Sequence, residues 1–304
     1  KKDIRYTQPV LNPAGTLMAY AENEHGSYQI IVKEVGSNRS RVVWKSGYKT
    51  VDQRIDYKLP VLAWRTNTQL GFVEARRGQM VLRQINSTRR RSRIPIFDDI
   101  RTPAVTLSQF SQVRDMSYSE DGSTLLISAV HDGQTDLYLL SSGGRMQQQL
   151  TNDIYDDIQP VFLKGGSNNI AFSSNRFVDT TGQTATGTFS GVVNNYDIFL
   201  MPRDGGSARQ ITFSIASELR PRATADGNLG YLGEETGGRR LYQYNIATGV
   251  SRPFTNFLQD IESYDLGGEA NALVLTASDN ARSFVYAFPT FSPTTQESLP
   301  KTSR

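Results

Sequence analysis

The chain has 304 residues, of which 38% are hydrophobic and 10% aromatic, and its formal net charge is only +3. It contains no cysteine, which excludes a disulfide, a thiolate nucleophile and a cysteine-ligated metal site. Its apolar runs are too short for a transmembrane helix, and its small net charge argues against a nucleic-acid partner.

One pattern recurs six times: a short strand, a tight turn, an apolar strand, a second turn and a further strand. The equivalent anchor positions are Pro9, Pro60, Asp115, Pro160, Pro221 and Ser263. Successive differences between these residue numbers are 51, 55, 45, 61 and 42. This spacing matches the period of about 40–50 residues that is typical of four-stranded propeller blades with loop insertions.

The expected strands alternate regularly with turn residues. In chain order the apolar strands are predicted at 17–21 and 28–32, 69–73 and 79–82, 124–128 and 136–140, 169–176 and 197–201, 229–232 and 240–244, and 272–275 and 283–286. Asp121-Gly122 and Asp226-Gly227 stand at the same place in two copies, where glycine supplies the positive φ that a tight hairpin needs. No stretch keeps apolar residues at helical spacing over three turns. We therefore predict an all-β fold, a six-bladed β-propeller of four-stranded antiparallel blades.

The predicted domain covers residues 1–291, and 292–304 is expected to be a linker or disordered tail. The blades are placed at about 5–50, 54–97, 110–152, 155–213, 216–256 and 258–291. The last blade lacks an obvious fourth strand, since prolines follow its third strand. We expect that strand to come from Lys1–Tyr6 or from residues outside this sequence, and we expect the chain to be part of a longer protein.

The third and fourth copies carry the sharpest motifs. They are Ser119-Glu-Asp-Gly-Ser-Thr-Leu-Leu-Ile-Ser128, Asp136-Leu-Tyr-Leu-Leu140 and Gln149-Leu-Thr151, and Ile170-Ala-Phe-Ser-Ser-Asn-Arg176, Asp197-Ile-Phe-Leu-Met201 and Gln210-Ile-Thr212. This combination resembles the TolB-type propeller repeat, a WD40-like repeat, and also the propellers of prolyl-oligopeptidase-like peptidases. The resemblance to TolB implies a periplasmic, protein-binding propeller of the cell envelope. TolB carries an α/β domain before its propeller, whereas this sequence starts almost at the first blade.

No catalytic constellation is evident. The two histidines, His25 and His131, fall in equivalent turns of two copies, which indicates a repeated turn role. Gly-x-Ser-x-Gly and Gly-Lys-Ser/Thr motifs are absent from the sequence. We predict that this chain has no enzymatic activity, no resident metal and no other cofactor.

Three features are candidate sites. Polar residues of the innermost strands are expected at the channel rim, either to bind a partner segment or to line a water-filled channel: Gln8, Arg114, Asp115, Gln159, Arg220, Arg222 and Glu262. The long insertion 177–195 ends in the apolar residues Phe189, Val192 and Val193, which either dock a partner or belong to a mobile loop. Asp156-Asp157 reads as a solvated loop, with a Ca²⁺ ion at the channel mouth as the alternative.

The resemblance to the TolB-type repeat, together with the absence of catalytic motifs, implies a non-enzymatic interaction or scaffold module of a bacterial envelope machine. Its expected partners are other envelope proteins, and its expected location is the periplasm or the periplasmic face of the outer membrane. One alternative is the substrate-gating propeller of a larger prolyl-oligopeptidase-like hydrolase. Another is a glycan-binding propeller that uses exposed aromatic residues.

Overall fold

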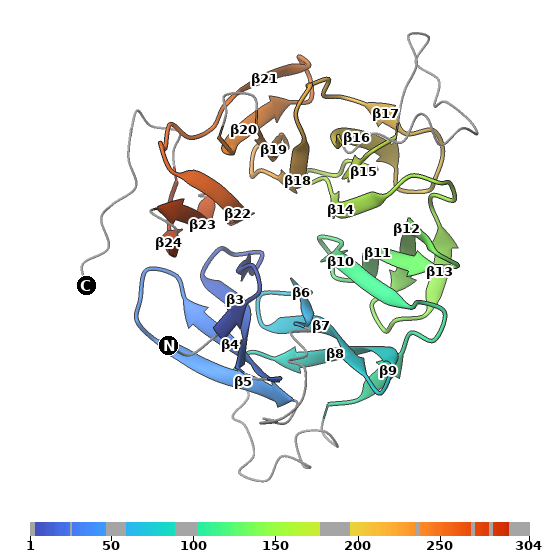
Figure 1. Cartoon of the computed structure of the whole chain (residues 1–304), viewed down its shortest axis with the longest axis vertical. Coiled ribbons are helices and arrows are strands. Elements are labelled where there is room, and N and C mark those ends of the chain that lie inside the picture. The colour runs from blue at the N-terminus through green and yellow to red at the C-terminus, as the bar shows by residue number, and fades with distance from the viewer. Residues whose placement is uncertain are drawn as a thin grey trace.

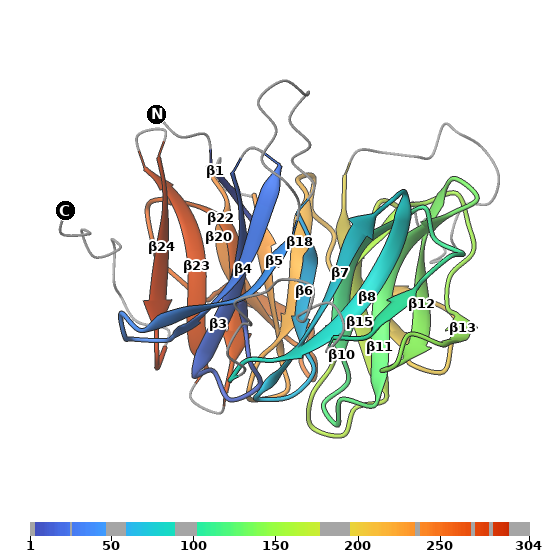
Figure 2. The ribbon, with the colours of Figure 1, turned by 90° about the horizontal axis from the view of Figure 1, so that it is seen from below.

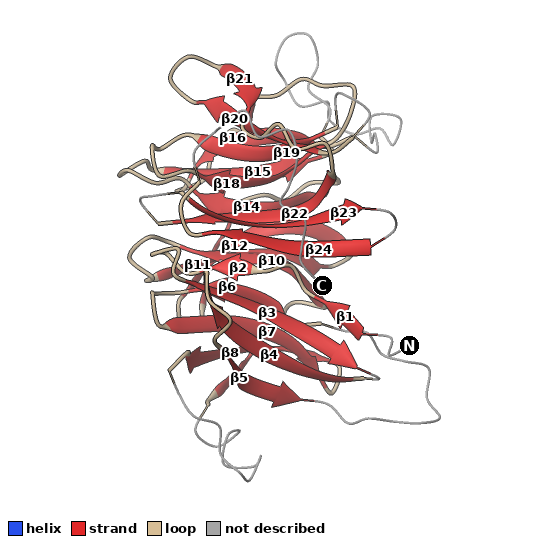
Figure 3. Cartoon of the chain, turned by 90° about the vertical axis from the view of Figure 1, so that its left-hand side faces the viewer, coloured by secondary structure: helices blue, strands red, loops and turns tan. Residues whose placement is uncertain are grey.

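The six repeats form six small antiparallel sheets that are arranged as a ring around one axis, and the prediction of a six-bladed β-propeller is confirmed (Figure 1). The computed structural model describes residues 4–24, 26–46, 59–88, 102–176, 195–234, 238–268, 271–279 and 282–291. The described residues form strands and connecting turns only (Figure 3). None of them forms a helix long and apolar enough to cross a bilayer.

Each blade begins with a strand beside the ring axis and is built outward from it. The innermost strands are β1 (Ile4–Tyr6) and β2 (Val10–Leu11) in the first blade, then β6 (Val61–Trp64), β10 (Gln112–Tyr118), β14 (Asp157–Phe162), β18 (Glu218–Ala223) and β22 (Asp260–Gly267). The second strands are β3 (Leu17–Glu24), β7 (Gln69–Arg76), β11 (Thr124–His131), β15 (Asn169–Ser174), β19 (Leu229–Gly233) and β23 (Ala272–Asp279).

The outer half of each blade continues the same antiparallel order. The third strands are β4 (Ser27–Glu34), β8 (Gln79–Asn86), β12 (Gln134–Ser141), β16 (Asp197–Pro202), β20 (Arg240–Asn245) and β24 (Arg282–Phe288). The fourth strands are β5 (Ser40–Ser46), β9 (Ala104–Thr106), β13 (Met146–Gln149), β17 (Arg209–Gln210) and β21 (Val250–Pro253). The last sheet has three strands, β22, β23 and β24, among the described residues.

Two expectations about blade limits need correction. The second blade was predicted to end near residue 97, but its fourth strand is β9 at Ala104–Thr106, which pairs with β8. Lys1–Tyr6 was one of two candidate sources for the outer strand of the last blade, but Ile4–Tyr6 pairs with β3 inside the first blade. It does so because Val10–Leu11 covers only the other end of β3, so the two short strands share one edge.

The apolar core lies between neighbouring blades. Both faces of a blade are covered, so second strands are apolar at consecutive positions: Leu126 packs toward the fourth blade, while Leu125 and Ile127 pack toward the second. Five of the six seams hold large clusters of buried side chains. The seam between the last and first blades is the exception, with four buried apolar residues, Leu11, Met18, Ala272 and Val274.

Glycine allows neighbouring blades to approach closely at two equivalent places. A Cβ atom on Gly71 would lie 2.4 Å from the hydroxyl oxygen of Tyr118 in the next blade. At the seam between the fifth and sixth blades, a Cβ on Gly230 would lie 3.1 Å from the hydroxyl oxygen of Tyr264. In both cases a tyrosine of one innermost strand covers a glycine on the second strand of the preceding blade.

We expect Gly71→Ala to lower the free energy of unfolding by about 1–3 kcal/mol, because the added methyl group overpacks a seam. Chemical denaturation followed by fluorescence would measure the loss. Gly143→Ala is the matched control, since a Cβ there would meet nothing closer than Ser141 Oγ at 3.8 Å. Equal effects of the two substitutions would contradict the account of the seam.

Candidate functional site

The innermost strands surround a central channel (Figure 1). At the end where the first and second strands turn, the channel opens into a cavity of about 880 Å³ that is lined by innermost-strand residues of all six blades. Arg222 and Asp265 border this cavity from neighbouring blades. The channel is therefore a pocket to which every blade contributes.

Four predicted rim residues form a chain of hydrogen bonds beside the channel. The backbone N–H of Gln159 donates to Asp115 Oδ2 over 3.2 Å, and the backbone N–H of Arg220 donates to Gln159 Oε1 over 2.8 Å. The guanidinium of Arg220 in turn donates to Gln8 Oε1 in the first blade. The third, fourth, fifth and first blades are thus connected through side chains that the sequence analysis selected.

An irregular backbone makes these contacts available. The pairing of β14 and β18 with their second strands shifts register near Gln159 and Arg220. Both residues adopt a positive φ, 56° for Gln159 and 60° for Arg220, which is unfavourable for residues with a side chain. The resulting bulge turns their N–H groups away from the sheet ladder and toward an acceptor on the preceding blade.

A second connection joins the fifth, sixth and first blades. Arg222 Nε donates to Asp265 Oδ1 over 3.0 Å, and Asp265 Oδ2 accepts the backbone N–H of Leu11 over 2.7 Å. The Tyr264 hydroxyl donates to the carbonyl oxygen of Arg220 over 2.8 Å. Asp265 was missed in the sequence analysis, although it stands only three residues after the predicted Glu262 on the same strand.

Burial opposes charge on the acids of this network. It raises the pKa of Asp115, while the nearby guanidiniums of Arg220 and Arg222 act in the opposite direction. Burial likewise raises the pKa of Asp265 against the attraction of Arg222. Burial lowers the pKa of Arg220 to about 10, so its guanidinium remains charged at neutral pH.

The remaining predicted residues lie apart from this network. Arg114 Nη1 lies 3.9 Å from Asp156 Oδ2, and both side chains are partly exposed. Glu262 accepts a hydrogen bond from Ser283 Oγ over 2.8 Å. Together with Gln8, it lines a groove of about 900 Å³ between the last and first blades. The rim therefore divides into a linked set and two separate charges.

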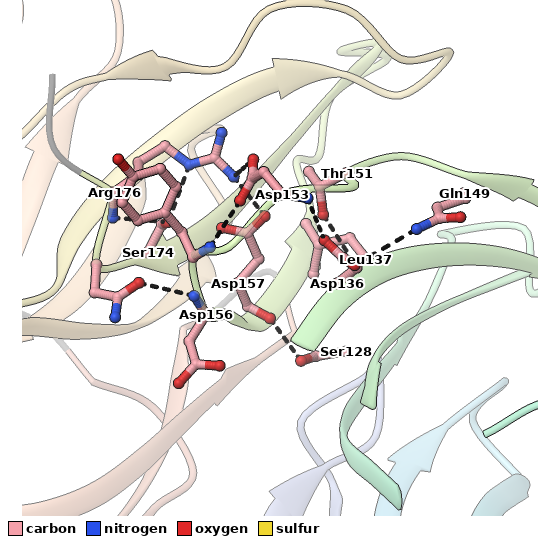
Figure 4. Close-up of polar contacts among 12 residues, drawn as sticks. Ser128, Asp136, Leu137, Gln149, Thr151, Asp153, Asp156, Asp157, Ser174 and Arg176 are labelled. Carbon is pink, nitrogen blue, oxygen red and sulfur yellow. Dashed lines mark hydrogen bonds and ion pairs between the residues drawn. The ribbon is translucent and has the colours of Figure 1, made fainter. Parts of the chain in front are cut away.

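An acidic cluster that the sequence analysis did not assemble lies at the seam between the third and fourth blades (Figure 4). Carboxylate oxygens of Asp136, Asp153 and Asp157 lie within 4.8 Å of one another. Arg176 Nη2 lies 2.5 Å from Asp157 Oδ2 and 3.2 Å from Asp153 Oδ2. Arg176 is the last residue of the Ser-Ser-Asn-Arg motif, and its buried guanidinium neutralises part of the cluster.

The predicted Ca²⁺ alternative concerned Asp156-Asp157. These neighbours point to different surroundings: Asp157 is buried against Arg176, whereas Asp156 lies near Arg114 and the Tyr196 hydroxyl. Because the guanidinium of Arg176 already supplies a cation to Asp157, the chemistry of this set fits a structural ion pair better than a calcium site. The absence of a metal stays a prediction, with Ca²⁺ at Asp156-Asp157 as its alternative.

The cluster anchors the loop that connects the third and fourth blades. The N–H of Leu137 donates to Thr151 Oγ1 over 3.0 Å, and Asp136 Oδ1 accepts the N–H of Asp153 over 3.4 Å. The loop between the fourth and fifth blades repeats both contacts. There the N–H of Ile198 donates to Thr212 Oγ1, and the N–H of Ser214 donates to Asp197 Oδ1. The Asp and Thr of the repeat motifs therefore hold the inter-blade loops.

The remaining candidates are the two histidines and the predicted partner loop. His131 Nδ1 lies 2.7 Å from the carbonyl oxygen of Gln109, which fits the predicted turn role. His25 and the predicted partner loop with Phe189, Val192 and Val193 lie outside the described residues.

Comparisons with known proteins identify the fold. No protein-family model matches the sequence, and no curated protein sequence matches it. A structure of a putative TolB from Agrobacterium tumefaciens is 17% identical, with a TM-score of 0.61 over 87% of this chain and 86% of that one. TolB from Acinetobacter baumannii is 16% identical, with a TM-score of 0.59 over 93% of this chain and 60% of that one.

A protease propeller matches almost as well. The β-propeller domain of the Trilobed protease from Pyrococcus furiosus, described as having an open velcro topology, is 11% identical. Its TM-score is 0.56 over 94% of each chain. At these identities the similarities show the fold, and this chain has a TolB-like propeller fold.

We expect removal of the buried guanidinium in Arg176→Met to cost about 3–5 kcal/mol of unfolding free energy at neutral pH, since Asp157 would be left buried without its partner. Denaturant titration would measure the cost. In the control Arg239→Met, which breaks the more exposed pair with Glu234, the cost should be about 0–1 kcal/mol. A small effect of Arg176→Met would show that the cluster is not organised by this ion pair.

Stability should also depend on pH through two equivalent acids. Burial raises the pKa of Asp136 and that of Asp197 to about 6, above the ordinary value of 3.8. The folded state therefore binds these protons more tightly than the unfolded chain does. The stabilisation is complete below about pH 4 and is lost as the pH rises through about 6.

The substitutions Asp136→Asn and Asp197→Asn should each flatten the decline in stability between pH 4 and pH 6, by up to about 3 kcal/mol per site. Unfolding free energies of the variants, measured between pH 4 and pH 6, would test this prediction. If the double variant loses as much unfolding free energy over this range as the unsubstituted protein, other groups cause the decline.

Proposed function

We propose that this chain is a non-enzymatic interaction module of a bacterial cell envelope. In this role it binds other envelope proteins in the periplasm or at the periplasmic face of the outer membrane. The observation that carries the proposal is the hydrogen-bonded set Gln8, Asp115, Gln159 and Arg220 on the innermost strands, together with Arg222 and Asp265, which border the channel cavity. The TolB-like fold supports the same assignment.

The chemistry of the rim suits recognition of a polypeptide. Arg222 donates one hydrogen bond from Nε to Asp265 and one from Nη1 to the carbonyl oxygen of Pro221, and it borders the cavity. The exposed Arg114 and the half-buried Glu262 could meet opposite charges on a partner. Among the described residues, His131 bonds a backbone carbonyl rather than a serine, so no serine–histidine pair is formed there.

A charge-reversal experiment tests the role of the rim. The purified chain is immobilised and exposed to periplasmic and outer-membrane extracts of a bacterium that encodes it, and the retained proteins are identified and purified. We expect the double variant Arg114→Glu/Glu262→Lys to weaken binding of the purified partner at least about tenfold. Its matched control is Asp204→Lys/Arg209→Glu, which alters charges on the outer side of the fourth blade and should leave the affinity unchanged.

Retention of no envelope protein would overturn the interaction role. Equal binding by both double variants would remove the rim from the interface.

A second candidate, from another class, is the gating propeller of a larger hydrolase. It is favoured by the match to the protease propeller of Pyrococcus furiosus, which covers 94% of each chain. An α/β-hydrolase domain with a nucleophile elbow in the same gene product would select this candidate. Sequencing the complete gene therefore separates the two functions.

A further inference from the structure

A groove separates the last blade from the first, along the seam that closes the ring. It has a volume of about 900 Å³ and is bordered by β22, β23 and β24 on one side and by β1, β3 and β4 on the other (Figure 2). We call it the seam groove. It differs from the channel cavity, which lies at the ring axis and has residues of every blade in its wall.

The equivalent seam between the third and fourth blades is filled by apolar side chains. Leu137 of β12 holds the place that Val285 holds in β24, because both pair with the residue opposite the anchor of their innermost strand. Phe172 of β15 and Tyr20 of β3 are equivalent positions of second strands. Leu137 and Phe172 are fully buried in one apolar cluster, whereas Val285 is 54% exposed and Tyr20 is half-buried at the groove.

An open seam costs the fold free energy of burial. A blade can bury its faces only against its neighbours, so the surface of Val285 and Tyr20 that faces the groove remains in contact with water. A concave site with apolar walls and a few polar groups is the form that ligand pockets take in proteins. The seam groove therefore has the properties of a binding site.

Two tyrosines form an aromatic wall on the side of the first blade. The ring centroids of Tyr6 and Tyr20 lie 6.3 Å apart, and the ring planes are inclined by 52°. Tyr6 is 57% exposed. Burial, followed by the nearby carboxylate of Glu22, raises the pKa of both hydroxyls above 10.0, so both stay protonated at neutral pH and can donate. This wall offers flat apolar faces with hydroxyl groups at their edges.

The wall on the side of the last blade is mostly polar. Glu262 Oε1 accepts a hydrogen bond from Ser283 Oγ over 2.8 Å, and the hydroxyl oxygens of Ser263 and Thr276 lie 2.6 Å apart. All four residues border the groove. Carboxylate and hydroxyl oxygens accept hydrogen bonds from ligand hydroxyl groups, and the protein hydroxyls can also donate.

Charge limits the class of ligand. The charged side chains that the described residues contribute to the groove are Lys33, Glu34 and Glu262, and no arginine is among them. One ammonium against two carboxylates does not favour an anion. A peptide strand would bind at a free sheet edge, whereas β3 and β23 are paired on both sides and border the groove with their side chains.

A neutral sugar matches both walls. Its ring has C–H bonds on its faces, which can lie against an aromatic side chain, and hydroxyl groups around its edge, which can pair with carboxylate and hydroxyl oxygens. We propose that the seam groove binds a neutral oligosaccharide, with sugar rings stacked on Tyr6 and Tyr20 and hydrogen-bonded to Glu262. This inference goes beyond the proposed interaction role and assigns a second site, for another class of ligand.

The experiment exposes the full gene product to an array of immobilised oligosaccharides, both neutral ones and ones that contain uronic acids. The Kd of the most strongly bound neutral oligosaccharide is then measured by isothermal titration calorimetry. We expect Tyr6→Ala to raise that Kd about tenfold, because a stacking face is lost. The matched control Phe213→Ala removes an aromatic residue that is 77% exposed in the loop between β17 and β18, and it should leave the Kd unchanged.

A second variant fills the groove instead of enlarging it. Val285→Trp places a large side chain at an exposed position of the groove wall. We expect it to raise the same Kd at least about tenfold by steric exclusion, without lowering the free energy of unfolding. Denaturant titration of both variants shows whether a loss of affinity accompanies a loss of stability.

Each outcome decides the proposal. A neutral oligosaccharide whose Kd rises in Tyr6→Ala and in Val285→Trp but not in the control supports it. Binding of no neutral oligosaccharide, binding of acidic ones alone, or equal Kd values for all variants would overturn it. If no oligosaccharide binds and the two variants instead weaken binding of the purified envelope partner, the groove belongs to the protein interface and the interaction function stands.

Discussion

The structure depends on burial of apolar surface between blades. A blade is a single sheet whose two faces are both apolar, so it has no core of its own and can be stable only between two neighbours. Closing the ring meets this requirement for every blade at once. Among the described residues, the seam between the last and first blades has the smallest apolar cluster, four buried residues, with a groove of about 900 Å³ beside them. In the described part of the chain, the sheet of the last blade has three strands, β22, β23 and β24.

Polar contacts fix the position of each blade relative to its neighbour, because apolar packing alone is not directional. Near the channel, the N–H groups of Gln159 and Arg220 are turned toward the preceding blade by backbone bulges. Farther out, Asp136 and Asp197 hold the loops that lead into the next blade. Both kinds of contact connect one blade to the next. The residues that fix the position of each blade relative to its neighbour therefore also line the channel or hold the inter-blade loops.

The repeat pattern was sufficient to predict the fold, because turn residues and apolar strands recur with a period that few architectures share. It also placed Gln8, Asp115, Gln159 and Arg220 near one another, since equivalent positions of innermost strands must meet at the axis. The spacing of residues in the sequence could not predict the cluster that Asp136, Asp153 and Asp157 form with Arg176. These residues come from two blades and meet only because the blades pack against each other. The limit of the second blade was missed because β9, at only Ala104–Thr106, is too short to give a pattern.

A repeated fold acquires a specific binding face only where its copies differ. The Asp–Thr scaffold is shared by the loops after the third and fourth blades, and it fixes the backbone without using the residue at the tip. That residue is free to vary, and it is aliphatic in three consecutive loops, at Ile154, Ile215 and Leu258, whereas Gln109 occupies the corresponding position, three residues after Thr106, before the third blade. Neighbouring loops can therefore differ at the exposed tip while they share the contacts that hold the backbone. The surface of the ring can vary in this way without any change in the seams on which folding depends.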